Sequence, residues 1–169
     1  METIDELATF ILPEARLDLK SLALHYVLSM TGSFESRELL LKHSGILENL
    51  TKIAFSPEEQ SQIQKDALLT FINLAADEFN AQALLYRLPH LVAKLIAYIC
   101  QETSKQADAA CSVLSNLSRG TQACKKIARY FTSSDANNNG APAHSLESLL
   151  KVFCTEGFNK TNTLNYLGA

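Results

Sequence analysis

Apolar residues recur along this chain at the spacing of a helix face. Two stretches show the pattern most clearly, because their apolar positions fall three or four residues apart instead of on every second residue. These positions are Ile63, Ala67, Phe71 and Leu74 in one stretch, and Ala107, Ala110, Leu114 and Leu117 in the other. Each set makes one apolar stripe on a helix, which predicts an all-α protein.

Turn-forming residues divide the chain into short helices. Gly32, Gly45, Pro89 and Gly120 interrupt the apolar pattern, and Ser56-Pro57 has the form of a helix cap with proline at the first helical position. These helix-breaking residues predict helices at 3–12, 14–31, 34–43, 46–55, 58–76, 78–88, 90–101, 104–118, 120–131, 145–155 and 161 onward.

The helical segments also repeat. Segment 67–75 aligns without a gap with segment 110–118, which lies 43 residues later, and a more diverged copy, segment 23–31, lies 44 residues earlier. The alignment places Asn73 over Asn116 and over Ser29 in the diverged copy. A helical repeat of about 40 to 47 residues is typical of armadillo and HEAT proteins. We therefore expect an all-α, armadillo/HEAT-type, right-handed superhelical solenoid.

This periodicity predicts a single domain over residues 1–169 with about three repeats. Its expected parts are a partial N-terminal repeat at 1–31, repeats at 32–76 and 77–118, and a repeat at 119–169 that contains a polar loop at 132–143. The last helix ends after barely two turns, and Leu164, Tyr166 and Leu167 stand where a terminal repeat needs a polar outer face. We therefore expect a truncated terminal repeat and a fragment of a longer solenoid.

Composition and charge narrow the functional classes. The net charge is −3 and there is no basic face or tail, which argues against nucleic-acid binding. No run of about 18 apolar residues is present, so no membrane partner is expected. The first six residues carry three acids and no basic residue, which argues against a signal or transit peptide. The four cysteines do not pair at C-x-x-C spacing, and free thiols are the better interpretation.

The usual signatures of enzymes are missing. The sequence contains none of the phosphate-binding glycine loops, the H-E-x-x-H zinc motif or the G-x-S-x-G nucleophile motif. The four histidines are scattered, and none pairs with a cysteine or an acid at metal-ligand spacing on one helix face. We expect a protein that is not an enzyme and that needs neither a metal nor a cofactor.

The helices around Asn73 and Asn116 resemble the armadillo consensus, in which an asparagine on the third helix of each repeat faces the concave groove. The resemblance implies that these asparagines bond the backbone of an extended peptide, which a carboxamide can do with its donor and its acceptor. A purely structural hydrogen bond is an equally good interpretation. Members that bind nuclear import signals carry tryptophan one turn earlier, where this chain has Leu69 and Ser112. Recognition of basic import signals is therefore not expected.

A closer resemblance covers nearly the whole chain. The chain resembles the N-terminal part of an armadillo-like cochaperone family that assists the folding of eukaryotic translation elongation factor 2. The similar segments are 15–20 with 26–32, 73–77, 114–119, and 153–159 with 164–167. The resemblance implies a cytosolic adaptor, expected to be a monomer, that presents elongation factor 2 to the chaperonin and to chaperones.

The residues expected to contact a partner lie on or beside the repeated third helices. They are Asn73, Asn116, Ser29, Leu69, Ser112, Asp77 and Arg119. Two other interpretations stay open at this point. One is a generic armadillo scaffold that binds an extended peptide in its groove. The other is a truncated fragment without a function of its own.

Overall fold

The structure, a computed structural model, describes residues 2–132, 146–155 and 157–158. Within these ranges the regular elements are ten α-helices, and no strand occurs. The helices are α1 (Glu2–Phe10), α2 (Leu17–Met30), α3 (Phe34–Lys42), α4 (Ser44–Phe55), α5 (Ser61–Leu74), α6 (Glu78–Arg87), α7 (Leu91–Ile99), α8 (Ala107–Ser118), α9 (Thr121–Thr132) and α10 (Leu146–Cys154). The expectation of an all-helical protein is confirmed for this part of the chain.

Side-chain caps explain where several helices begin. The Ser33 hydroxyl accepts a hydrogen bond from the Ser36 backbone N–H at the start of α3, and the Asp77 carboxylate accepts one from the Asn80 backbone N–H at the start of α6. Each cap satisfies a backbone donor that has no partner within the first turn of its helix. Ser33 and Asp77 are 44 residues apart, so the repeat seen in the sequence is also a repeat of caps.

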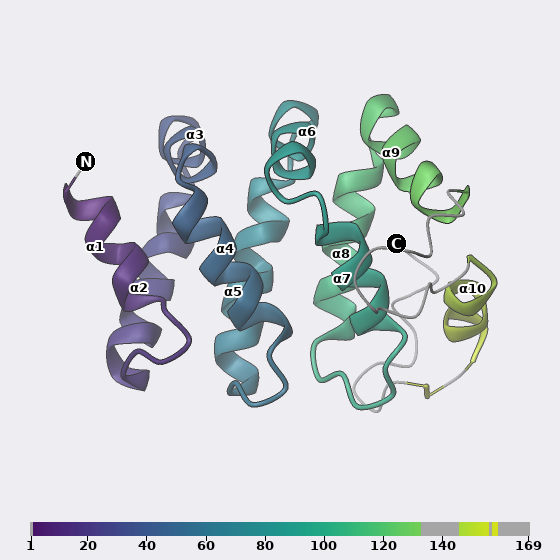
Figure 1. The fold of residues 1–169 in the computed structure, drawn as a ribbon, viewed down its shortest axis with the longest axis horizontal. Coiled ribbons are helices and arrows are strands. Elements are labelled where there is room, and N and C mark those ends of the chain that lie inside the picture. The colour runs from purple at the N-terminus through teal and green to yellow at the C-terminus, as the bar shows by residue number, and fades with distance from the viewer. Residues whose placement is uncertain (1, 133–145, 156, 159–169) are drawn as a thin grey trace.

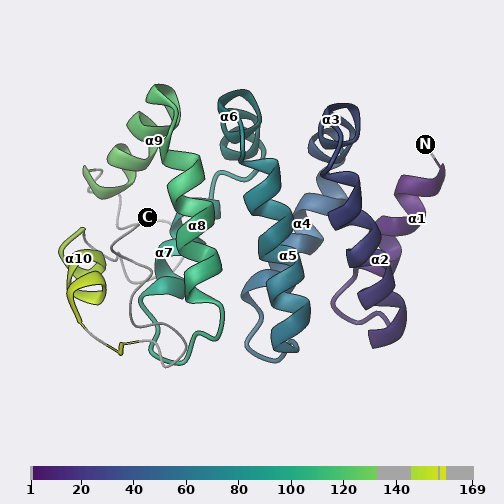
Figure 2. The same ribbon diagram turned by 180° about the vertical axis from the view of Figure 1, so that it is seen from behind.

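The helices stack as two equivalent triplets, α3–α4–α5 and α6–α7–α8. Each helix contacts its equivalent in the other triplet, α3 against α6, α4 against α7 and α5 against α8. As a result α3, α6 and α9 follow one edge of the molecule (Figure 1), and α2, α5 and α8 lie side by side on one face (Figure 2). This stacked arrangement of helices is consistent with an α-solenoid.

One continuous apolar core runs through the stack. Phe71 is its largest fully buried side chain, and the predicted stripes of α5 and α8 lie in it: Ile63, Ala67, Leu74, Ala107, Ala110 and Leu117 are all buried. Leu114, the remaining stripe residue, is partly buried and packs against the same core. Full burial of an aliphatic or aromatic side chain contributes about 1.5–3 kcal/mol, so these stripes supply much of the stability of the stack.

Three predicted helix starts, at residues 14, 58 and 104, lie three residues before the observed ones at Leu17, Ser61 and Ala107, and tertiary contacts explain the last two. The helix predicted from residue 58 begins at Ser61, and Pro57 lies in a turn and not at a first helical position. That turn is held by Lys20, whose Nζ donates to Glu59 Oε2 at 2.6 Å, and by Gln64, whose amide donates to the Ser56 carbonyl. The helix predicted from residue 104 begins at Ala107. Here the buried Ser104 hydroxyl donates to the Tyr98 carbonyl and holds the chain in a turn.

The other described helix ends agree with the predicted ranges to within two residues, the usual uncertainty of a helix end. Thr132, predicted to open the polar loop, is the last residue of α9. The rest of that loop, and the truncated helix predicted from residue 161, lie outside the described residues. The division of the domain into repeats stays a prediction.

Candidate partner-binding surface

Five of the predicted partner-binding residues lie on the three helices that stand side by side in Figure 2. They are Ser29 on α2, Leu69 and Asn73 on α5, and Ser112 and Asn116 on α8. Ser29, Asn73 and Ser112 are exposed, whereas Leu69 and Asn116 are half-buried. We call the surface formed by these five residues the third-helix face. The structure therefore brings together positions that are 43 or 44 residues apart in sequence.

Both asparagines hydrogen-bond to the preceding repeat. Asn73 Nδ2 donates to Thr31 Oγ1 at 2.8 Å, and Asn116 Nδ2 donates to the Ile72 carbonyl at 3.0 Å. These bonds join α5 to the end of α2 and α8 to α5, so the structural interpretation of the asparagines is correct. Each bond uses the amide nitrogen only. Within the described part of the chain, the side-chain oxygens of Asn73 and Asn116 accept no hydrogen bond.

The serines of the third-helix face turn their hydroxyl protons inward. Ser29 Oγ donates to the Tyr26 carbonyl at 2.7 Å, and Ser112 Oγ donates to the Asp108 carbonyl at 3.1 Å. A serine that donates to a carbonyl of its own helix keeps its lone pairs available as acceptors. Together with the two asparagine oxygens, the third-helix face therefore carries several hydrogen-bond acceptors that no described residue uses.

Asp77 and Arg119 lie at helix ends next to this face. Asp77 uses both carboxylate oxygens within its own cap, since Oδ1 accepts from the Asn80 backbone N–H at 2.9 Å and Oδ2 accepts from Asn80 Nδ2 at 2.7 Å. Arg119 is the exposed C-terminal cap residue of α8. Arg119 is therefore fully available to a partner, whereas Asp77 is half-buried and its carboxylate caps α6.

A buried carboxylate lies beneath the third-helix face, between α2 and α5. Asp66 is only 3% exposed, and its Oδ1 accepts a hydrogen bond from Gln62 Nε2 at 2.8 Å. Its Oδ2 has no hydrogen-bond partner in the described residues and lies 4.0 Å from His25 Nε2. The local sequence around Asp66 does not predict this burial, because an acid on a helix is exposed by default. Its proximity to His25, 41 residues away, depends on the packing of α2 against α5.

The cysteines are free thiols, as the sequence predicted. Cys111 is buried in the core, and burial is the main cause that raises the pKa of its thiol to about 12, with smaller contributions from Asp108 and Cys100. Cys124 and Cys154 are exposed. In the described ranges no group of three or more His, Cys, Asp or Glu side chains is placed to hold a metal ion. In the same ranges no helix has the length and apolar character needed to cross a bilayer.

Comparison with known proteins gives one consistent result. The model of a family described as a domain of unknown function, DUF383, matches residues 98–169. Proteins named HGH1 homolog are 34% identical in Danio rerio, 32% in Homo sapiens and 29% in Xenopus laevis. Each of these alignments covers 96% of this chain but only 39–42% of the relative. The chain is thus similar to the HGH1 homologues over nearly its whole length and spans about two fifths of theirs.

Proposed function

We propose that this chain is a protein-binding adaptor and not an enzyme, and that it acts as the N-terminal part of a cochaperone for translation elongation factor 2. The single observation that carries the binding role is the third-helix face, where stacked helices present exposed polar positions at the repeat spacing. The choice of elongation factor 2 rests on the sequence resemblance described above.

The proposed adaptor works through an extended surface instead of a single pocket. Stacked helical repeats can grip a partly folded client through many weak contacts without a cofactor or nucleotide. In this role the chain is an armadillo-type solenoid that acts in the cytoplasm as a monomer. It binds neither nucleic acid nor membranes. Its partners are elongation factor 2 together with chaperonin or chaperones.

A second mode of binding is favoured by one specific observation. The side-chain oxygens of Asn73 and Asn116 are acceptors without partners in the described residues, at equivalent positions of successive repeats. Backbone N–H groups of an extended peptide are suitable donors for such acceptors. An extended segment of the client is therefore the part that we expect to lie along the third-helix face.

Affinity capture from eukaryotic cytosol tests the adaptor role. The chain is immobilised, the captured proteins are identified by mass spectrometry, and circular dichroism confirms that each variant is folded. We expect enrichment of elongation factor 2 or chaperonin subunits by the unaltered chain, and at least a fivefold loss with Asn73→Ala combined with Asn116→Ala.

The matched control is Asn49→Ala. Asn49 Nδ2 also donates to a backbone carbonyl, that of Ala8 at 3.0 Å, but it lies on α4 away from the third-helix face. Asn49→Ala should therefore keep the capture even if it lowers stability. A folded, unaltered chain that enriches none of these partners would contradict the proposed function. Equal losses in Asn49→Ala and in the double variant would contradict the role of the third-helix face.

A further inference from the structure

A second surface lies on the other side of the repeats, around the C-terminal end of α6. Three hollows of about 410, 400 and 280 Å³ meet there, and Arg87 lines all three. The first lies between α6 and α9, and the others lie where the α6–α7 turn passes α4. We call these three hollows together the α6 trough. It shares no residue with the third-helix face.

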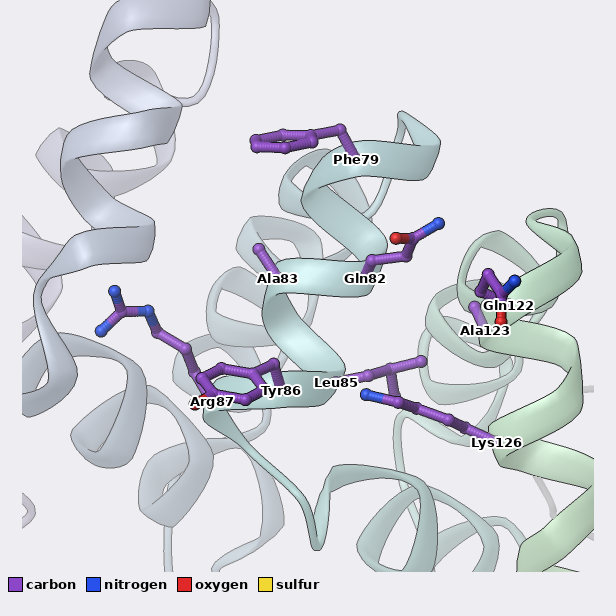
Figure 3. Close-up of a pocket in the computed structure, with 9 residues that line it drawn as sticks. All are labelled: Phe79, Gln82, Ala83, Leu85, Tyr86, Arg87, Gln122, Ala123 and Lys126. Atoms are coloured by element: carbon purple, nitrogen blue, oxygen red, sulfur yellow. The ribbon is translucent and has the colours of Figure 1, made fainter.

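The apolar part of the α6 trough is unusually exposed. Phe79 and Tyr86 on α6 are 69% and 80% exposed, although phenylalanine is among the residues most often buried in folded proteins. Figure 3 shows them on the side of α6 that carries Ala83, with Leu85 facing α9. Leu88 and Pro89 continue the apolar lining into the other two hollows. Exposed aromatic residues that gather around hollows are typical of sites that anchor a partner side chain.

The charged part of the α6 trough is basic. Its lining carries four exposed cations, Arg87, Lys126, Lys52 and Lys94, against one acid, Glu48. The chain as a whole has a net charge of −3, so the excess of positive charge around the α6 trough is opposite in sign to the net charge of the chain. The Lys126 side chain extends from α9 toward Leu85 (Figure 3). None of the ion pairs between described residues includes one of these four cations.

We propose that the α6 trough binds an acidic, extended segment of a partner protein, which places an aromatic or aliphatic side chain beside Tyr86 and its carboxylates near Arg87 and Lys126. Charge complementarity selects the acidic chemistry, because cations that form no ion pair with the described residues attract anions and raise the rate of encounter. Arg87 also donates a hydrogen bond to the Lys42 carbonyl at 3.4 Å. The aliphatic lining of Leu85, Leu88 and Pro89 favours a protein segment over a nucleic acid, whose phosphates require a wider basic surface than four cations on an acidic chain.

Selection from a phage-displayed library of random dodecapeptides on the unaltered chain tests this proposal. We expect enriched peptides to carry Asp or Glu on both sides of one large apolar residue. Their affinity, measured by fluorescence anisotropy of labelled synthetic peptides, should fall as salt is raised. It should also fall at least tenfold in Arg87→Glu combined with Lys126→Glu, and several-fold in Tyr86→Ser. These side chains are exposed, and circular dichroism confirms the fold of each variant.

The control variant is Lys105→Glu combined with Lys151→Glu, which makes the same change of charge at two exposed positions outside the trough. It should bind the selected peptides as the unaltered chain does, and so should Asn73→Ala combined with Asn116→Ala. Three results would overturn the proposal. These are enriched peptides without acidic residues, binding that survives charge reversal at Arg87 and Lys126, and tighter binding of a single-stranded RNA dodecamer than of any selected peptide.

Discussion

The α2–α5 junction and the α5–α8 junction occupy equivalent places in the stack but are built from different chemistry. At the first junction the buried position is Asp66, with one oxygen lacking a partner among the described residues. At the second junction the equivalent position, 43 residues later, is Ala109, which is 8% exposed. The same helix packing thus tolerates a buried carboxylate in one repeat and a methyl group in the next.

The two linking asparagines differ in the same way. Asn73 is exposed and donates to a side-chain hydroxyl, that of Thr31, whereas Asn116 is half-buried and donates to a backbone carbonyl, that of Ile72. The first junction is therefore the more polar and more accessible of the two. Residues at equivalent positions of two repeats have the same place in the fold, but their neighbouring residues determine which hydrogen bonds they form and how exposed they are.

The largest expected effect comes from the aromatic residue that α5 contributes to the core. Phe71→Ala should lower the free energy of unfolding by about 4 kcal/mol, because it removes a fully buried aromatic side chain and leaves a cavity. Leu114→Ala, at the equivalent position of α8, should cost only about 2 kcal/mol because Leu114 is partly buried. Urea denaturation followed by circular dichroism measures both. Equal losses would mean that the two repeats contribute equally to the core.

Exchanging the buried residues of the two junctions is the next strongest test. Ala109→Asp should lower the free energy of unfolding by about 3 kcal/mol, because it buries a carboxylate where the second junction packs a methyl group that is 8% exposed. The reverse change, Asp66→Ala, should alter stability by less than about 1 kcal/mol, since the lost bond from Gln62 is offset by removal of a buried oxygen that accepts no hydrogen bond from the described residues. Urea denaturation measures both variants, and an Ala109→Asp variant as stable as the unaltered chain would show that the two junctions tolerate a buried carboxylate equally.

The asparagines should differ by a smaller amount. Asn116→Ala is expected to cost about 1.5 kcal/mol, because it leaves the Ile72 carbonyl without its donor in a half-buried place. Asn73→Ala should cost about 0.5 kcal/mol, because water can replace the lost donor at an exposed site. Thermal and urea unfolding of the two single variants measure the difference. A larger loss for Asn73→Ala would reverse the ranking of the junctions.

Thiol reactivity measures how well the core around Cys111 on α8 excludes solvent. Cys111 is buried on α8 at the position equivalent to Leu68 of α5, and its pKa is raised by burial to about 12 from an ordinary value near 9. A raised pKa keeps the thiol protonated and unreactive at pH 8, so iodoacetamide should label the exposed Cys124 and Cys154 at least tenfold faster than Cys111. Mass spectrometry of peptides reads the labelling.

The control for this labelling is the unfolded chain, in which all four cysteines should react at similar rates. The same pKa shift adds a dependence of stability on pH. Because the folded state holds the Cys111 proton more tightly than the unfolded state, this stabilisation is complete below pH 9 and is lost between about pH 9 and pH 12. Labelling of Cys111 as fast as Cys124 in the folded chain would show that the second junction opens readily.

Much of the fold could be predicted from the sequence because its determinants are local and periodic. Apolar stripes with helical spacing specify helices wherever a buried face is needed, and the 43-residue offset between segments 67–75 and 110–118 places equivalent residues on neighbouring helices. For the same reason the third-helix face could be anticipated: Asn73 and Asn116 are displayed together by the repeat itself.

Tertiary structure alone decided the remaining features, because they depend on residues far apart in the chain. The start of α5 at Ser61 depends on Lys20 reaching Glu59, 39 residues away, which no local cap signal contains. The burial of Asp66 beside His25 depends on α2 packing against α5. The α6 trough gathers cations from α4, α6, α7 and α9. Periodicity determined which helices exist and in what order, whereas contacts between them determined which charges are buried, paired or left for a partner.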